Sequence, residues 1–291
     1  MTQTQSILPP AVAIGGLGGS GTRVFAAMLQ YAGYHIGNTL NDPLDNLWFT
    51  VLFKQAAWAR AQPDPADVAN AVRLFRRAMT TGLSDDLSAD DAALITRLRA
   101  DLPPEGPWHC GAQTFHADAL VASGPSDGPW GWKEPNTHIF LPHLNQGIAG
   151  LRYIHVVRNG LDMAFSANTW QARHWGHLYG LPNTPDVSLP IRQLLFWTVA
   201  NRATLDYGAR HMPGRFLVMH YEDVCARPDP NWQRMRRFLD LPDTLALPAE
   251  MLRPTTIGRS LDHDLSVFPK DLIKASAAVQ HDVEKLDAFG S

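Results

Sequence analysis

The stretch that decides the fold is Ala13-Ile14-Gly15-Gly16-Leu17-Gly18-Gly19-Ser20-Gly21-Thr22-Arg23, near the start of the 291-residue chain. An apolar run ends at Ile14, five glycines follow in the turn, and a helical stripe begins at Val24. This pattern predicts a strand, a glycine loop and a helix. The backbone N–H groups of such a loop and the helix N-terminus bind anions, so the expected ligand is a phosphate or a sulfate.

The loop has the glycine spacing of a Walker A motif without its lysine. Gly16 and Gly21 enclose four residues, as in G-x-x-x-x-G-K-[ST]. Thr22 stands at the lysine position, and Arg23 stands where the magnesium-binding hydroxyl belongs. A magnesium-dependent nucleoside triphosphatase is therefore disfavoured. An ATP-dependent P-loop kinase for a small metabolite and a non-catalytic nucleotide-binding protein of the same fold stay open as alternatives.

Composition bounds the class of protein. The formal charge of −3 and the pI near 6.4 argue against a surface for nucleic acid. Cys110 and Cys225 are the only cysteines and lack metal-ligand spacing, so we expect no metal site and a reducing compartment. No apolar run is long enough to span a bilayer, and residues 1–10 do not read as a secretion signal. We expect a cytoplasmic protein without a membrane span.

The order of elements predicts an α/β fold. Four strands, at about 11–15, 130–133, 152–157 and 215–221, alternate with helices. Such alternation is typical of a three-layer α/β/α arrangement around a central parallel sheet. Two helices, which begin near Asp64 and Ser88, lie between the first two strands. We expect them to form a helical cap, inserted at about 59–105, in a single domain of residues 1–291.

A second motif surrounds the end of the third predicted strand. The strand runs into Arg158, Asn159 or Asp162 can start the helix that follows, and Ser166 lies eight positions after the arginine. A guanidinium binds a phosphate in bidentate fashion, and a hydroxyl one or two turns along the helix adds another donor. Arg158 and Ser166 are thus a pair of side chains that is chemically suited to a phosphate.

Three further segments carry polar residues at strand or loop ends. Lys133 ends the strand in Trp130-Gly131-Trp132-Lys133-Glu134-Pro135, and the carboxyl ends of parallel strands hold the ligand. We therefore expect Lys133 beside the glycine loop. A later strand ends in Tyr221-Glu222-Asp223, and Gly258-Arg259 forms a loop near the C-terminus.

Together these motifs resemble the sulfotransferases that use 3′-phosphoadenosine-5′-phosphosulfate (PAPS), over roughly half of the chain. The resemblance implies a P-loop kinase-like fold, of the P-loop-containing nucleotide hydrolase type. Ser20-Gly21-Thr22 looks like the family's 5′-phosphosulfate loop, and Lys133-Glu134-Pro135 looks like the element whose lysine contacts the sulfuryl group. The implied nucleotide-binding residues are Gly18, Gly19, Ser20, Gly21, Thr22 and Arg23 at the 5′-phosphosulfate, Arg158, Ser166, Gly258 and Arg259 at the 3′-phosphate, and Tyr221 nearby.

The chain departs from the family at Gly19, where many members carry a lysine or arginine before S-G-T. Either Arg23 or Lys133 then has to supply that positive charge at the catalytic site. The choice between the two stays open at this point.

The implied reaction moves a sulfuryl group from PAPS to a hydroxyl or amine of a small-molecule, glycan or lipid acceptor, without a metal. A carboxylate would take the acceptor proton. Asp45 and Asp42 are the first catalytic candidates, although Asn and Asp near proline also make turns and helix caps. Glu134 is the reserve, followed by His116 and His138. The loop at 170–190 would line the acceptor pocket or pack on the cap, and a homodimer stays open.

Overall fold

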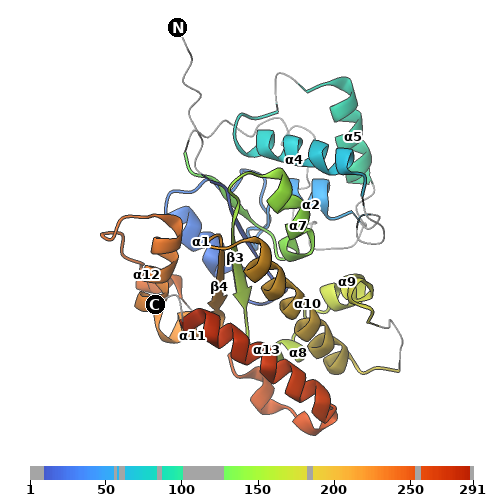
Figure 1. The fold of residues 1–291 in the computed structure, drawn as a ribbon, viewed down its shortest axis with the longest axis vertical. Coiled ribbons are helices and arrows are strands. Elements are labelled where there is room, and N and C mark those ends of the chain that lie inside the picture. The colour runs from blue at the N-terminus through green and yellow to red at the C-terminus, as the bar shows by residue number, and fades with distance from the viewer. Residues whose placement is uncertain are drawn as a thin grey trace. The chain divides into compact units, whose positions relative to one another are not determined.

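The computed structural model describes residues 10–55, 58, 63–83, 87–100, 128–181, 186–252 and 257–288. Its strands are β1 (Val12–Gly16), β2 (Gly131–Lys133), β3 (Arg152–Val157) and β4 (Phe216–His220). They form one parallel sheet in the order β2-β1-β3-β4, and residues 153–157 of β3 pair in register with 216–220 of β4. Helices flank the sheet (Figure 1). The predicted α/β class is confirmed.

All five residues of β1 are buried, as expected of a strand inside a sheet. β1 ends at Gly16, where the glycine loop begins, and α1 (Thr22–Tyr31) follows the loop. The predicted strand, loop and helix are therefore all present. The carboxyl end of the strand delivers the loop to the edge of the sheet at which parallel α/β proteins bind ligands.

The two predicted helices of the cap, α4 (Pro65–Met79) and α5 (Ala89–Ala100), begin where the sequence predicts. Asp64 caps α4 by accepting a hydrogen bond from Ala66 N at 2.8 Å, and Pro65 occupies the first position. The remaining helices are α2 (Leu47–Phe53), α7 (Thr137–Gly147), α8 (Gly160–Ala164), α9 (Trp170–Trp175), α10 (Leu189–His211), α11 (Tyr221–Ala226), α12 (Pro228–Leu239) and α13 (Lys270–Ala288), with short 3₁₀ turns η1 (Gly176–Tyr179), η2 (Ala249–Met251), η3 (Arg259–Asp262) and η4 (Leu265–Val267).

The chain divides into two compact units. The first comprises residues up to 13, 29–134 and 140–152. Its interior is aromatic: the rings of Phe75 and Trp132 meet edge to face at 5.0 Å, and Phe49 stacks on Phe53 at 5.1 Å. Aromatic pairs of this kind contribute beyond the apolar area that they bury, so this cluster forms the core that holds α2 and α4 together.

The second unit comprises residues 14–28, 135–139 and 153–291. α10 packs on both α8 and α13, and the three lie side by side in Figure 1. Gly160 permits the close approach of α8 and α10, because a Cβ there would lie 2.9 Å from the Trp197 ring. This unit contains the glycine loop and the segment after β3. The predicted single domain over residues 1–291 stays a prediction.

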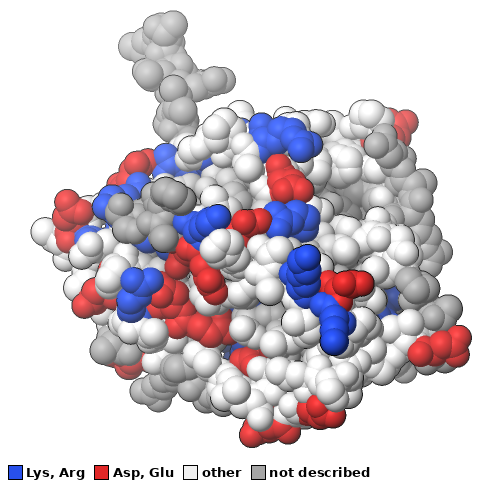
Figure 2. Space-filling view, turned by 60° about the horizontal axis from the view of Figure 1, so that its bottom comes forward, with Lys and Arg blue, Asp and Glu red and all other residues white. Residues whose placement is uncertain are grey.

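Two sequence expectations about local structure are wrong. The segment after residue 169 is not a loop, because α9 and η1 occupy residues 170–179. Ser166 is not on a helix, because α8 ends at Ala164. No helix in the described part of the chain combines the length and apolar character that crossing a membrane requires. On the face in Figure 2, lysines and arginines lie among aspartates and glutamates.

Candidate active site

The glycine loop of the second unit encloses a buried hydroxyl. Gly16 N donates to Pro135 O at 3.1 Å, and Ser20 N donates to Leu17 O at 2.9 Å, which closes the turn. The side chain of Ser20 is 1% exposed, and its Oγ has no hydrogen-bond partner among the described residues. It is turned into the loop, 2.9 Å from where a Cβ on Gly16 would stand. A buried polar atom without a partner is rare and requires a reason, such as a ligand.

The loop depends on glycine at two positions. Gly19 and Gly21 have φ values of 98° and 93°, in the left-handed region that side chains rarely adopt. A Cβ on Gly21 would stand 2.5 Å from Cε2 of Tyr221, and one on Gly19 would stand 3.4 Å from Oγ of Ser166. Three segments distant in sequence therefore meet at the loop.

Arg158 brings positive charge to the loop. It follows β3 directly and is 5% exposed. Its Nη1 donates to Gly19 O at 3.4 Å, and its Nη2 lies 3.7 Å from Oδ2 of Asp162. Its Nε lies 3.7 Å from Oε1 of Glu222, and its Cζ lies 5.5 Å from the ring centre of Tyr221. The guanidinium is thus held beside the loop by a carbonyl, two carboxylates and an aromatic ring.

Asp162 holds the loop at 257–260, which we call the late loop, beside Arg158. Its carboxylate accepts hydrogen bonds from Gly258 N at 2.7 Å, Ser260 N at 2.9 Å and Ser260 Oγ at 2.8 Å. Burial raises the pKa of this carboxyl, but these bonds and the charge of Arg158 more than offset it, so the pKa lies below its ordinary value. Arg259 Nη1 lies 3.5 Å from Asp162 O. Both residues of the predicted G-R pair are therefore near the arginine after β3.

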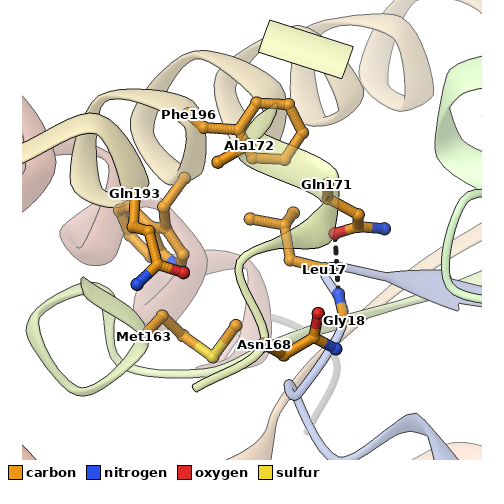
Figure 3. Close-up of a pocket in the computed structure, with 9 residues that line it drawn as sticks. Leu17, Gly18, Met163, Asn168, Gln171, Ala172, Gln193 and Phe196 are labelled. Atoms are coloured by element: carbon orange, nitrogen blue, oxygen red, sulfur yellow. Dashed lines mark hydrogen bonds between the residues drawn. The ribbon is translucent and has the colours of Figure 1, made fainter. Parts of the chain in front are cut away.

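A small pocket opens beside the loop (Figure 3). Its lining carries no ionisable side chain and consists of Leu17, Gly18, Met163, Asn168, Gln171, Ala172, Gln193, Phe196 and Trp197. The N–H of Gly18 donates to Oε1 of Gln171 at 2.7 Å, as the dashed line in Figure 3 marks. Gln171 Nε2 and Trp175 Nε1 both donate to Oδ1 of Asn136, at 2.7 Å and 2.9 Å. The sequence analysis singled out neither Gln171 nor Asn136.

In the first unit, the predicted lysine and one predicted carboxylate form a buried ion pair. Lys133 Nζ contacts Oδ1 of Asp45, and the two side chains are 2% and 11% exposed. Asn41 Nδ2 donates to the other oxygen of Asp45 at 3.0 Å. Asp42 is exposed in the preceding turn. The structure therefore brings Asp45, and not Asp42, to Lys133.

A second buried ion pair lies one residue further along. Lys54 Nζ is 2.9 Å from Oε1 of Glu134, with side chains 3% and 1% exposed. Asn46 N donates to Lys133 O at 2.8 Å, and Asn46 Oδ1 caps α2. The two ends of α2 are thus tied to consecutive residues at the end of β2. The sequence signal for Lys54 is a single charge directly after the apolar run 47–53.

The remaining candidates are separate from these clusters. Arg23 is exposed on the first turn of α1. His138 is buried, and burial lowers its pKa to about 4, although Pro135 O accepts a hydrogen bond from its ring at 2.9 Å. His116 lies outside the described residues. No group of three or more metal-ligating side chains occurs in the part of the chain that the structure describes.

A family model described as "Sulfotransferase family" matches residues 10–244, which covers most of the chain and both phosphate-site motifs. The chain belongs to the sulfotransferase family. A search of curated proteins found no match to the sequence.

The solved structures that the chain matches include three sulfotransferases. A sulfotransferase domain from the curacin biosynthetic pathway aligns over 95% of this chain and 98% of that chain, with 14% identity and a TM-score of 0.48. A sulfotransferase from Mycobacterium tuberculosis aligns over 93% and 77%, with 13% identity and a TM-score of 0.44. One from Alicyclobacillus acidocaldarius aligns over 97% and 96%, with 14% identity and a TM-score of 0.43.

Proposed function

We propose that this sulfotransferase takes its sulfuryl group from PAPS and passes it to a hydroxyl or amine of an acceptor. The observation that carries the proposal is the buried hydroxyl of Ser20, which has no hydrogen-bond partner among the described residues. It belongs to a loop whose Gly19 carbonyl lies 3.4 Å from Arg158. A phosphate oxygen would satisfy the hydroxyl, and the guanidinium would meet a second phosphate. A donor with phosphate at both the 5′ and 3′ positions accounts for both groups.

In this proposal the second unit binds the nucleotide. The loop amides and the α1 N-terminus hold the 5′-phosphosulfate, Arg158 and Ser166 hold the 3′-phosphate, and the late loop fixed by Asp162 closes beside it. The full set of proposed binding residues is Gly18, Gly19, Ser20, Gly21, Thr22, Arg23, Arg158, Ser166, Tyr221, Gly258 and Arg259.

The proposed step transfers the sulfuryl group in line. The acceptor oxygen or nitrogen forms a bond to sulfur while the bond from sulfur to the 5′-phosphate oxygen breaks, and the phosphate keeps the electron pair. The acceptor proton passes to a carboxylate, for which Asp45 is the first choice because it is buried and oriented by Asn41. Such proton transfer contributes about 10²–10⁴-fold. Lys133 stabilises the oxygens on sulfur.

Asp42 and Arg23 are assigned secondary roles in the proposal because both are exposed. Lys133, which is 2% exposed, is the stronger candidate for the charge that Gly19 does not provide. A sulfuryl group carries less negative charge than a γ-phosphoryl group, so a lysine and the loop amides suffice without a metal ion.

The donor assignment is tested by titrating the protein with adenosine 3′,5′-bisphosphate in a calorimeter. We expect Arg158→Ala to lose about 1.5–3 kcal/mol, the range for a hydrogen bond to a charged group, which is roughly a 10- to 150-fold weaker Kd. Arg210→Ala removes an exposed arginine of α10 and should leave Kd unchanged. Unchanged binding by a folded Arg158→Ala protein would remove the central assignment.

Turnover tests the catalytic residues separately. Incubation of sulfur-labelled PAPS with extract of the source cell identifies the acceptor by the label it takes up. With that acceptor, Lys133→Ala should lower turnover and keep the bisphosphate bound. A variant with wild-type turnover would exclude a catalytic role for Lys133. Stabilisation by ATP with Mg²⁺, but not by the bisphosphate, would support the kinase alternative instead.

A further inference from the structure

A row of polar side chains leads from Arg158 to the C-terminal helix. Oε1 of Glu222 lies 3.7 Å from Arg158 Nε and accepts a hydrogen bond from Asn159 N at 3.0 Å. Oε2 of Glu222 lies 3.0 Å from Nε2 of His220, and that ring nitrogen lies 2.9 Å from the side-chain nitrogen of Gln280. The side chains of His220 and Glu222 are only 13% and 18% exposed. The row therefore connects α13 to the arginine of the proposed phosphate site.

Two oxygens in this row lack a hydrogen bond from any described residue. They are Oε2 of Glu222 and Oε1 of Gln280, both buried. When His220 is neutral, its Nε2 accepts a hydrogen bond from Gln280 and cannot donate one to the carboxylate of Glu222. A protonated ring instead offers an Nε2–H to Glu222. Turning the carboxamide of Gln280, whose O and N atoms exchange places, presents its oxygen to the same N–H and gives up its bond to Oε1 of Glu284 at 3.3 Å. A proton on His220 therefore supplies the donor that Oε2 of Glu222 lacks.

The charges around His220 favour that proton. Glu222 faces it from α11, and Glu284 and Asp287 face it from α13. Burial lowers the pKa of His220, but these three carboxylates more than offset burial, so the pKa lies above 6.5. The neighbouring cation on α12 is Arg234, which is paired with Asp287. The ring consequently keeps its proton to higher pH than an ordinary histidine does.

The carboxylate between His220 and Arg158 links the two cations. Asp223, the next residue of α11, points to Arg227 and Asn231 instead, at 2.7 Å and 2.6 Å. When His220 is charged, its positive charge balances the negative charge of Glu222, and the positive charge of Arg158 stays available to a phosphate. When His220 is neutral, Glu222 repels the phosphate and competes for the guanidinium. The charge on one ring thereby sets the anion affinity of the arginine.

We propose that His220 and Glu222 couple proton uptake to the binding of a nucleotide phosphomonoester at Arg158. This inference rests on the proposed function, because it requires a phosphate at Arg158. His220 is a positioning residue in this scheme, since it acts on the ligand through Glu222. Affinity for adenosine 3′,5′-bisphosphate falls as the pH rises through the pKa of His220. By linkage, binding of the bisphosphate takes up a proton.

Calorimetric titrations of adenosine 3′,5′-bisphosphate between pH 6 and 9 test the coupling. For the wild-type protein we expect Kd to weaken by about fivefold or more across this range, the lower end of typical coupling. His220→Gln keeps a polar side chain without a charge and should bind weakly at every pH. Glu222→Gln keeps the oxygen that accepts from Asn159 N and should bind tightly at every pH. His211→Gln, on the exposed end of α10, is the matched control.

The comparison between variants removes the contribution of the ligand itself, because the second pKa of a phosphate ester lies near 6 and favours binding at higher pH. Titrations in two buffers of different ionisation enthalpy count the protons taken up. If His220→Gln shows the same pH dependence as the control, the coupling is refuted while the bisphosphate site stands. If the wild-type protein binds no bisphosphate at any pH, the proposed function fails, and the coupling fails with it.

Discussion

Two buried histidines of the second unit make the folded protein sensitive to acid. His155 is fully buried, and His138 is 5% exposed. Burial lowers the pKa of His155 to about 3 and that of His138 to about 4. His155 is held by Tyr153 Oη at 3.2 Å and by Asn201 Oδ1 at 2.9 Å, so it cannot turn toward water without breaking these bonds.

The sign and size of the effect follow from the proton balance. Below pH 6.5 the unfolded chain takes up a proton on each ring, and the folded chain does not. Each histidine then lowers the free energy of unfolding by about 1.4 kcal/mol per pH unit. From pH 6.5 to 4 each removes roughly 3 kcal/mol, and the two together remove about 6, against a typical total of about 5–15 kcal/mol. The two histidines therefore cost the folded state nothing well above pH 6.5, and they lower the free energy of unfolding progressively as the pH falls below that value.

Urea unfolding followed by circular dichroism at several pH values between 7 and 4.5 measures this loss. His138→Gln removes one titrating ring, so the slope of unfolding free energy against pH should fall by about 1.4 kcal/mol per unit below pH 6.5. His177→Gln replaces an exposed histidine of η1 and should leave the slope unchanged. Equal slopes for His138→Gln and His177→Gln would refute the reasoning.

Three further predictions concern the glycine loop, the Lys54–Glu134 ion pair and the late loop. Gly21→Ala should abolish bisphosphate binding in calorimetry, because the left-handed backbone and the Tyr221 ring both exclude a Cβ; wild-type affinity would contradict this geometry. Lys54→Met should cost about 3–5 kcal/mol in urea unfolding, since it breaks a buried ion pair, and adding Glu134→Gln should recover much of that loss. Asp162→Ala should weaken bisphosphate binding and also lower thermal stability, because it removes the buried acceptor of Gly258 N and Ser260. Trypsin should then cleave after Arg259 faster than in the wild type.

The sheet could be predicted from the sequence because its signals are local. β1, β3 and β4 are mostly apolar runs of five or six residues and β2 is a run of three, and all four predicted ranges agree with the structure to within about one residue at each end. The N-cap at Asp64 and the cap at Asn159 were also readable, because the side chain and the amides it binds are only a few residues apart. α13 carried a comparable signal in Leu272, Val279 and Val283, which lie on one buried face.

Contacts between distant segments account for what the sequence did not reveal. Gln171 reaches an amide 153 positions earlier, and Lys54 pairs with Glu134 from the far end of α2. Nothing near either residue marks it as special before the fold is known. The segment around Trp170 was misread as a loop because its aromatic residues have no helical period. Its short helix is held by tertiary contacts, including the bond from Trp175 to Asn136.

The bond between Gln171 and the Gly18 amide means that the glycine turn is braced by the chain's own carboxamide. The uncharged side-chain oxygen of Gln171 already accepts the hydrogen bond of the Gly18 amide, so that amide is oriented before any phosphate binds. Under the proposed function, the turn keeps its shape when no nucleotide is bound, and nucleotide binding requires an exchange of oxygens at the Gly18 amide instead of a refolding. Because the same glutamine donates to Asn136, any such exchange is transmitted to a second segment of the unit, where the Asn136 oxygen also accepts from the indole of Trp175.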